Sequence, residues 1–237
     1  MLILSVDSTA QTASVSLSDD NRFLAGTTLN IGNKHSTTLL PAIKFILEQT
    51  GKSVSDVELF AATAGPGSYT GVRIGVATVK GLALGRNVPC IGVSSLETMA
   101  QGMTACDGIV CAMINARRDR FFTACFSVEK GKIARLTDDD TLEGSVIEEY
   151  LNKQTKSVYL VGDGAEVFLG THQVTYASYV PEMQIYPNAY YAGVIAKRIY
   201  DDAEEVAREM FSADSLRPIY LRQPQAEREL NERMNNK

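Results

Sequence analysis

The sequence predicts a two-lobed α/β fold built from a duplicated unit, on three observations. The order strand, strand, strand, helix, strand, helix can be followed twice along the chain. In each copy the first strand ends in a polar turn, which begins at Asp7 in the first copy and at Asn115 in the second. Residues 61–85 pass from small apolar residues through a Gly-Pro-Gly-Ser break into helical spacing. We expect two lobes, 1–103 and 104–237, with the end of the second free to return to the first.

The first copy has the pattern of a three-strand meander followed by alternating helices and strands. Strands are predicted at 2–6, 12–18, 22–29, 59–64 and 90–93, and helices at about 36–49, 70–85 and 94–103. Ser36 or Thr38 is placed to cap the first helix, and Pro41 falls near its first turn, where a missing N–H costs little. Ser68 or Thr70 is placed to cap the second helix.

The second copy follows the same order after a boundary near 102–107. Strands are predicted at 109–114, 121–128, 133–136 and 158–161, and helices at about 143–152 and 188–200. Lys130 and Gly131 form the expected hairpin turn between two of these strands. The segment 216–222 has the pattern of a strand or an anchoring segment, and the charged residues 227–237 that of a solvated or frayed helix.

Composition argues for an ordinary globular protein. The net charge is −5 and the isoelectric point is near 5.2, so a surface that binds nucleic acid unaided is not expected, because phosphate neutralisation needs clustered cations. The four cysteines show no Cys-x-x-Cys pairing, which favours reduced thiols in a cytoplasm. The apolar run at the N-terminus stops at Asp7, too early for a signal peptide, and no apolar stretch has the length of a membrane span.

The helix predicted at 70–85 carries a face of small residues. Gly71 and Gly75 lie one turn apart and are followed by Ala77, Thr78 and Gly81. Each glycine costs roughly 1 kcal/mol against alanine inside a helix, so a close approach of another element is expected to compensate. Two interpretations remain open, namely tight packing on the protein's own sheet and contact with a partner. The preceding loop lacks the Gly-Lys-Ser/Thr of a P-loop.

Groups that could carry catalysis are scarce. His35 and His172 have no carboxylate or cysteine partner at helical spacing. Asp7 ends a strand, where it can hold a hydrated Mg²⁺ in a cleft or cap its own turn. Glu97 fits a capping box with the serine at 94, which favours a structural role. The cluster Arg-Arg-Asp-Arg at 117–120 is the local concentration of positive charge, and it can meet phosphate or an acidic partner if it faces the cleft.

Two facing lobes of this kind are like those of the actin, Hsp70 and sugar-kinase (ASKHA) superfamily, in which the polar turns hold nucleotide phosphates. More specifically, the chain resembles the TsaB (YeaZ) family, bacterial partner proteins in threonylcarbamoyladenosine (t6A) modification of tRNA. The matching segments are 3–9, 35–41, 65–75, 92–97, 115–117, 162–164 and 218–222, which span nearly the whole chain. The resemblance implies the two-lobed ASKHA fold.

The resemblance implies a non-catalytic subunit that binds a TsaD-like transferase in a complex with a TsaE-like ATPase. The related transferases place two metal-binding histidines on the helix that corresponds to 94–99, and this chain has none there. We therefore expect no metal, no transfer activity and no tightly bound cofactor, although ATP or ADP at a partner junction is compatible with the family. Contact with tRNA is expected only through the complex. The competing hypothesis is an active ATP-dependent kinase or ATPase of the same fold.

The family's contact surface comprises the helices that begin near Ser36 and Thr70 here. The partner or homodimer residues that this implies are Leu39, Gly71, Val72, Ile74, Gly75 and Thr78. The corresponding candidates for nucleotide or phosphate contact are Asp7, Ser8, Thr9 and Arg118. The chain departs from the family in its second polar turn, where Asn115 and Arg120 replace two acidic residues. That change puts a shared role of the turn in doubt.

Overall fold

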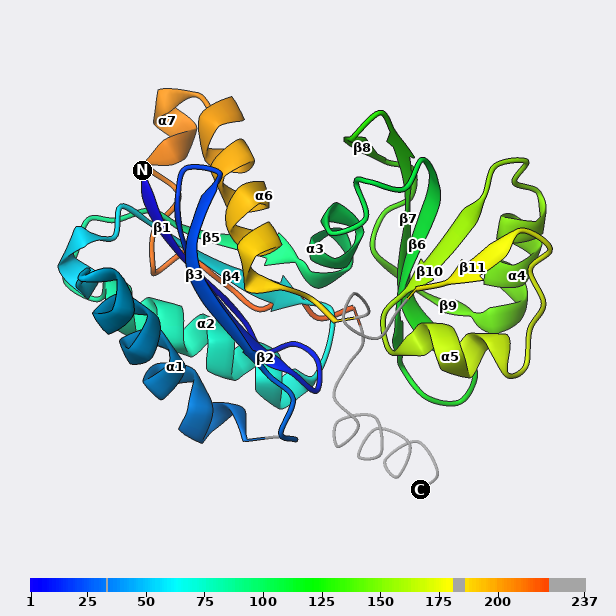
Figure 1. Ribbon diagram of the computed structural model, residues 1–237, viewed down its shortest axis with the longest axis horizontal. Helices are drawn as coiled ribbons and strands as arrows, with labels where there is room; N and C mark the ends of the chain where they lie inside the picture. Colours follow the sequence, from blue (N-terminus) through cyan, green and yellow to red (C-terminus); the bar gives the residue numbers. More distant parts are fainter. Residues whose placement is uncertain (33, 181–185, 222–237) are drawn as a thin grey trace, which may run out of the picture.

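The structure, a computed structural model that describes residues 1–32, 34–180 and 186–221, has two lobes, each built around its own sheet (Figure 1). The order across the first sheet is β3 (Arg22–Leu29), β2 (Ala13–Asp19), β1 (Leu2–Asp7), β4 (Leu59–Gly65) and β5 (Cys90–Ser94). The order across the second is β11 (Ala177–Tyr179), β10 (Val158–Val161), β6 (Gly108–Asn115), β7 (Arg120–Glu129) and β8 (Lys132–Arg135). A further strand, β9 (Asp140–Glu143), pairs with β7.

The two sheets share a topology, which confirms the predicted duplicated α/β fold. In each lobe the first strand pairs with the second antiparallel and with the next strand parallel, so β1 has the place of β6 and β4 that of β10. The first crossover runs through α1 (His35–Thr50), a short 3₁₀ turn (Val54–Asp56) and β4, and then α2 (Tyr69–Ala83) leads to β5. The corresponding helices of the second lobe are α4 (Gly144–Asn152) and α5 (Gly164–Leu169).

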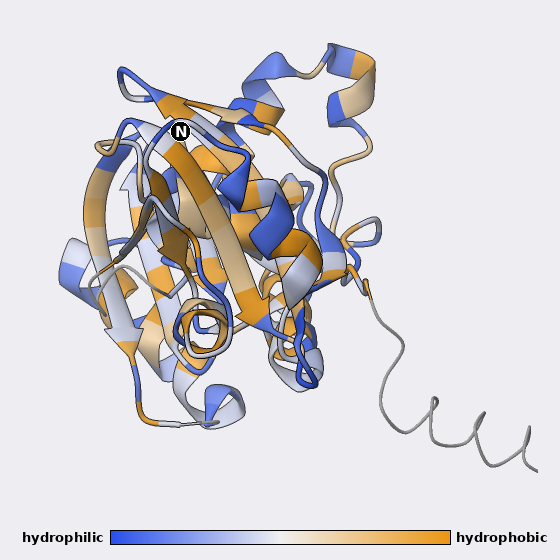
Figure 2. Cartoon of the chain, turned by 90° about the vertical axis from the view of Figure 1, so that its right-hand side faces the viewer, coloured by the Kyte–Doolittle hydropathy of each residue, from blue (hydrophilic) through white to orange (hydrophobic). Residues whose placement is uncertain are grey.

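Both faces of the first sheet are buried, which explains why β1 and β4 are apolar along their whole length. Side chains that alternate along these strands point to opposite faces. Leu4 and Phe60 face the core under α1 and α2, whereas Ile3, Leu59 and Ala61 face the other side. Figure 2, which looks from the side of the second lobe, shows the hydrophobic colour along the strands in view and hydrophilic residues on the helices and loops.

The helix that follows the last strand of each sheet packs on the sheet of the other lobe. Helix α3 (Ser95–Gln101), which follows β5, buries Leu96 and Met99 against the second sheet. Helix α6 (Ala189–Asp202) buries Ala192 and Ile195 against the first sheet, and α7 (Glu205–Arg208) follows it. In Figure 1 α3 lies between the lobes and α6 lies with the first lobe. The sequence-based division at 103/104 placed α6 in the second lobe, so the chain's return to the first lobe begins earlier than expected.

Local signals give mixed outcomes at the helix starts. Ser68 caps α2 as predicted, since its Oγ accepts the Gly71 N–H at 3.3 Å. The predicted cap of α1 is wrong, because α1 begins at His35 with no side-chain cap, and the Thr38 hydroxyl donates to the Lys34 carbonyl instead. The short elements β9, α5 and β11 were not predicted from the sequence.

The described end of the chain anchors on the first lobe without forming a strand. The Ile219 N–H donates to the Ala64 carbonyl at 2.7 Å, and Leu216 is buried in the core under α2. Of the two interpretations of 216–222, anchoring is confirmed for the part up to 221, and the predicted tail at 227–237 lies outside the described residues. All four cysteines are free thiols. Among the described residues, no helix combines the length and the apolar character needed to cross a membrane.

Candidate functional site

A cleft of about 590 Å³ opens between the two lobes, at the polar turns that the sequence singled out. The first lobe lines it with the turn after β1, the loop between β3 and α1, the loop between β4 and α2, and the start of α2. The second lobe lines it with the end of β6 and the turn after it, one residue of β7, and the turn after β10. The lining residues are Thr9, Ala10, Gln11, Gly32, Gly67, Ser68, Tyr69, Thr70, Ile114, Asn115, Arg117, Phe122 and Asp163. Of the candidates for phosphate contact, Thr9 lines the cleft, and Asp7, Ser8 and Arg118 do not.

Asp7 is fully buried and caps its own turn. Its carboxylate accepts hydrogen bonds from the Thr9 hydroxyl at 2.9 Å, from the Thr9 N–H at 3.3 Å and from the Thr63 hydroxyl on β4. Burial raises the pKa of this carboxyl to about 6, although the three donors oppose the shift. Of the two interpretations that the sequence left open for Asp7, turn capping is the one that the geometry supports.

The first-lobe turn is packed directly against the start of α2. The Thr9 carbonyl accepts the Ser68 N–H at 2.7 Å, and the buried Ser8 hydroxyl donates to the Gly71 carbonyl at 2.8 Å. A Cβ atom on Gly71 would collide with the Ser8 carbonyl oxygen, and one on Gly75 would lie 2.7 Å from Ser8 Oγ. Both glycines are therefore required by the protein's own β1–β2 turn.

This packing bears on the Mg²⁺–nucleotide complex that the superfamily implies. Such a ligand needs exposed turn residues and a carboxylate that can reach a hydrated cation. Here the Asp7 carboxylate and the Ser8 hydroxyl are engaged within the protein, and the Ser68 amide is already bonded to Thr9. The first-lobe residues do not fit a Mg²⁺–nucleotide. Within the described part of the chain, no group of three or more His, Cys, Asp and Glu side chains is placed to hold a metal ion.

The second-lobe turn differs, because its polar groups are exposed. Arg117 and Arg118 are both exposed, and Arg117 is the arginine that lines the cleft, a role the sequence assigned to Arg118. The Asn115 side-chain oxygen accepts the Arg117 N–H at 2.8 Å, and the Asn115 N–H donates to Asp163 at 3.2 Å. Sequence reasoning missed Asp163, since its Gly-Asp-Gly context indicated only the end of a strand.

His172 holds the far end of this turn. Its Nε2 lies 2.8 Å from Asp119 in the turn, and its Nδ1 lies 2.9 Å from Glu148 on α4. The ring stacks on Phe168 of α5 with centroids 4.9 Å apart, and it passes over Gly144, where a Cβ would collide with it. Desolvation lowers the pKa of His172, but the two carboxylates outweigh it and raise the pKa above its ordinary value. The sequence interpretation left His172 without a partner.

Comparison with known proteins shows the family of the chain. The family model described as "TsaD: tRNA N6-adenosine threonylcarbamoyltransferase" matches residues 30–230. The Escherichia coli K12 "tRNA threonylcarbamoyladenosine biosynthesis protein TsaB" is 35% identical over 69% of this chain and 72% of that protein. The Bacillus subtilis protein of the same name is 30% identical over 68% of this chain and 71% of that protein. The chain belongs to the TsaB family. The structure "YeaZ from Pseudomonas aeruginosa" shares its fold, with a TM-score of 0.74, 23% identity and coverage of 93% of this chain and 99% of that one.

The residues that TsaB membership implies for partner contact lie in α1 and α2, on one face of the first sheet (Figure 1). Leu39 and Val72 are buried in the core below these helices. Gly71 and Gly75 are buried against the β1–β2 turn. Ile74 and Thr78 are half-buried. Periodicity identified the helices correctly, but it could not tell their inward face from their outward one.

The outward face of the two helices mixes apolar and small residues with charged ones, among them the Lys44–Glu48 pair of α1 and Arg73 of α2. On α1, Leu40 and Phe45 keep 53% and 55% of their surface exposed. On α2, Ala77 and Gly81 are exposed, beside half-buried Ile74. This outer face, rather than the buried glycines, is what a partner of the first lobe can reach.

The α3 segment of this TsaB family member carries an ion-pair network. Glu97 accepts Arg198 of α6 at 2.5 Å and Arg135 of β8 at 2.9 Å, so it joins the two lobes. Arg135 also binds Asp139 at 2.6 Å, and Asp139 accepts the Ser94 hydroxyl at 2.5 Å. The predicted cap at Ser94 is confirmed by the Glu97 N–H at 3.2 Å, but the Glu97 side chain does not complete a capping box.

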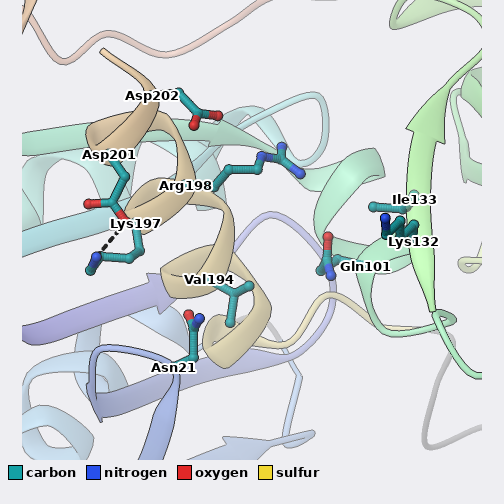
Figure 3. A pocket seen from close by; sticks show the side chains of 9 residues that line it. All are labelled: Asn21, Gln101, Lys132, Ile133, Val194, Lys197, Arg198, Asp201 and Asp202. Atoms are coloured by element: carbon teal, nitrogen blue, oxygen red, sulfur yellow. Dashed lines mark hydrogen bonds and ion pairs between the residues drawn. The ribbon is translucent and has the colours of Figure 1, made fainter. Parts of the chain in front are cut away.

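A second groove, of about 500 Å³, opens beside this network between α6, α3 and β8 (Figure 3). Arg198 extends from α6 toward β8, and Gln101 and Lys132 line the groove from the other two elements. Lys197 is turned away to Asp201, at 2.5 Å. Cations and carboxylates are mixed along its walls, so the groove presents no single charge to a ligand.

Proposed function

We propose that the chain is a non-catalytic subunit of the cytoplasmic machinery that forms t6A in tRNA. In this role it binds a TsaD-like transferase through the outer face of α1 and α2, in a complex that also includes a TsaE-like ATPase. Its relatives are named for tRNA threonylcarbamoyladenosine biosynthesis. Both relatives match over more than two thirds of their own length, which supports the transfer of their named role to this chain.

The observation that carries the non-catalytic part is the composition of α3. At the place where the transferases are expected to hold a metal with histidines, Leu96, Thr98 and Met99 are buried in the lobe junction. Glu97, the group there that can ionise, is held by two arginines. A helix whose side chains are used for packing and for lobe-to-lobe ion pairs supports a structural role.

The outer face of α1 and α2 supports the partner role. Apolar residues that are more than half exposed, Leu40 and Phe45, lie on the same face of the sheet as Ala77 and Gly81. Small side chains on α2 let the backbone of another helix approach closely, and exposed large side chains beside them supply area to bury. The same face fits a second copy of the chain, so homodimer and heterodimer are expected to compete for it.

The test is assembly with the TsaD-like transferase of the same organism. We expect the wild-type chain to co-elute with the transferase in size-exclusion chromatography and Ala77→Arg to abolish co-elution, because a long cation would stand in the centre of the contact. The matched control is Ser145→Arg, at an exposed position on α4 of the other lobe. Thermal unfolding checks that both variants fold. Retained assembly by a folded Ala77→Arg variant would refute the surface, and no assembly by the wild type would refute the partner role.

A further inference from the structure

The turn between β6 and β7 holds an unusual backbone conformation. Arg117, Arg118 and Asp119 have φ values of 66°, 56° and 52°, which places three successive residues other than glycine in the left-handed region. Each such residue costs of order 1 kcal/mol. A turn of this kind persists only where surrounding contacts fix it, and strained backbone of this sort is concentrated at functional sites.

Separate contacts fix this turn at its two ends. At the start, Asn115 is bonded both to Asp163 and to the Arg117 N–H. At the end, Arg120 pairs with Glu143 of β9 at 2.5 Å, and the Gly144 N–H donates to the Asp119 carbonyl at 3.0 Å. His172 then ties the Asp119 side chain to α4 through Glu148, as described above.

The histidine contact requires a doubly protonated ring. An ionised carboxylate only accepts hydrogen bonds, and both ring nitrogens of His172 face one, Asp119 from the turn and Glu148 from α4. Neutral imidazole carries a single N–H and can satisfy only one of them. The element beneath the ring, α5, contributes the uncharged face of Phe168. Deprotonation of His172 therefore releases one of the two carboxylates.

Two cations of the turn, Arg117 and Arg118, take no part in these contacts. Arg120 is neutralised by Glu143, whereas Asp119 and Glu148 share the single positive charge of His172 and so leave one negative charge at the far end of the turn. No ion pair or hydrogen bond of the Arg117 or Arg118 guanidinium is found among the described residues. The cleft beside Arg117 is lined by the half-exposed ring of Phe122. The ring of Tyr69, on the opposite wall, is already packed against the Arg73 guanidinium at 3.9 Å and against Tyr220. Guanidinium groups that bind phosphate, next to an aromatic ring such as that of Phe122 on which a base can stack, are the combination that single-stranded nucleic acid sites use.

We propose that the β6–β7 turn is an RNA-backbone contact, in which Arg117 and Arg118 bind phosphates of the tRNA while an unpaired nucleotide enters the cleft, and that His172 positions the turn. The inference rests on the proposed role in tRNA modification and names the element of this chain that touches the substrate. An acidic overall charge is compatible with it, because the turn adds a local contact to a complex and does not bind tRNA alone.

The test measures tRNA affinity of the reconstituted complex with the transferase, using fluorescently labelled unmodified tRNA across a range of salt concentrations. We expect Arg117→Ala/Arg118→Ala to weaken binding about tenfold and to reduce the slope of log affinity against log salt by about one to two. The control is Lys132→Ala/Lys156→Ala, which removes two exposed cations from the same lobe. Arg117→Lys/Arg118→Lys should restore most of the salt slope.

Unchanged affinity and slope in a complex that still assembles would overturn the inference and leave the proposed function standing. Equal losses in the lysine control would also overturn it, since the effect would then be general electrostatics. If the arginine variant no longer bound the transferase, the inference would also be overturned. The arginines would then contact an acidic surface of the partner protein and not the tRNA. If the wild-type chain does not assemble with the transferase, the proposed function and this inference fall together.

The role of His172 has its own readout. For the wild type we expect tRNA affinity to decline as pH rises through the pKa of His172, because one anchor of the turn is then lost. In His172→Gln, whose amide does not titrate, affinity should be lower and independent of pH over the same range. The Arg117→Ala/Arg118→Ala complex serves as the background for pH effects elsewhere. Parallel pH profiles for the wild type and His172→Gln would refute the positioning role.

Discussion

The turns after β1 and after β6 occupy equivalent places in the two lobes, yet they are built on opposite principles. The first is closed by packing, since Asp7 and Ser8 are buried and α2 comes close enough to require Gly71. The second is open, since Asn115 and the two arginines after it are exposed and the turn is held by charged contacts at its ends. A duplicated fold has thus kept its backbone plan in both copies while the two cleft walls have taken different chemistry.

The difference indicates which wall can still bind a ligand. In the first wall the Asp7 carboxylate, the Ser8 hydroxyl and the Ser68 N–H are bonded within the protein, so a ligand that needs these groups would have to break the packing of α2. In the second wall the guanidinium groups already stand in solvent, and only their positions are fixed. Packing and electrostatics respond differently to substitution and to pH, so variants of the two walls should separate them.

The largest expected effect belongs to the packed wall. Gly71→Ala should lower the free energy of unfolding by about 2–4 kcal/mol, because the added Cβ meets the Ser8 carbonyl and the Ser8–Gly71 hydrogen bond is lost. Gly81→Ala on the same helix is the matched control. No atom lies within 4 Å of a Cβ there, so helix propensity should raise stability by up to about 1 kcal/mol. Urea unfolding of both variants measures the difference, and similar values would refute the packing interpretation.

The buried carboxyl of the packed wall should make stability depend on pH. Folded Asp7 keeps its proton up to pH about 6, whereas an unfolded chain releases it near 3.8. The folded state is therefore favoured at low pH, and this stabilisation, up to about 3 kcal/mol, is lost as pH rises from about 4 to 6. Asp7→Asn should remove that slope from urea unfolding curves. The pKa of Asp56 is lowered by hydrogen bonds from Ser53, so this carboxyl favours the folded state more as pH rises. Asp56→Asn should therefore change the pH dependence of stability in the direction opposite to that of Asp7→Asn. An unchanged slope in Asp7→Asn contradicts the prediction.

The smallest effect is expected in the open wall. Arg120→Met removes an ion pair whose side chains are 42% and 55% exposed, so the free energy of unfolding should fall by less than about 1 kcal/mol. The loss should shrink further in 0.5 M salt, because exposed charges are screened over about a Debye length. Thermal unfolding at low and high salt measures both effects. A loss as large as that of Gly71→Ala would show that the two walls are not built differently.

More of the fold than of the site could be predicted from the sequence. Hydrophobic periodicity located most of the strands and the long helices, because each spans enough residues for its repeat to be visible. It could not show that α6 packs on the first sheet, since an apolar stripe is the same whichever sheet covers it. Leu39 and Val72 were assigned to a partner contact through the family resemblance, which points to the helices and not to one face of them, and both residues are buried.

The geometry of the site could not be predicted from the sequence where it depends on contacts between residues far apart in the chain. His172 meets Asp119, 53 positions away, and Glu148, 24 positions away, and no local pattern announces either contact. The placement of Arg117 rather than Arg118 in the cleft depends on three left-handed residues, which a run of charged side chains does not indicate. The outcome for Asp7 was open because a strand-end carboxylate can face either way.

The exchange of α3 and α6 between the lobes has a consequence for synthesis on the ribosome. The residues that α6 covers on the first sheet, Ile3, Leu59 and Ala61 among them, leave the ribosome long before residues 189–202 exist. Until then one face of the first sheet is bare, even though its strands are complete. The first sheet therefore cannot bury this face until α6 has been synthesised, and until then the face is open to contact with other nascent chains.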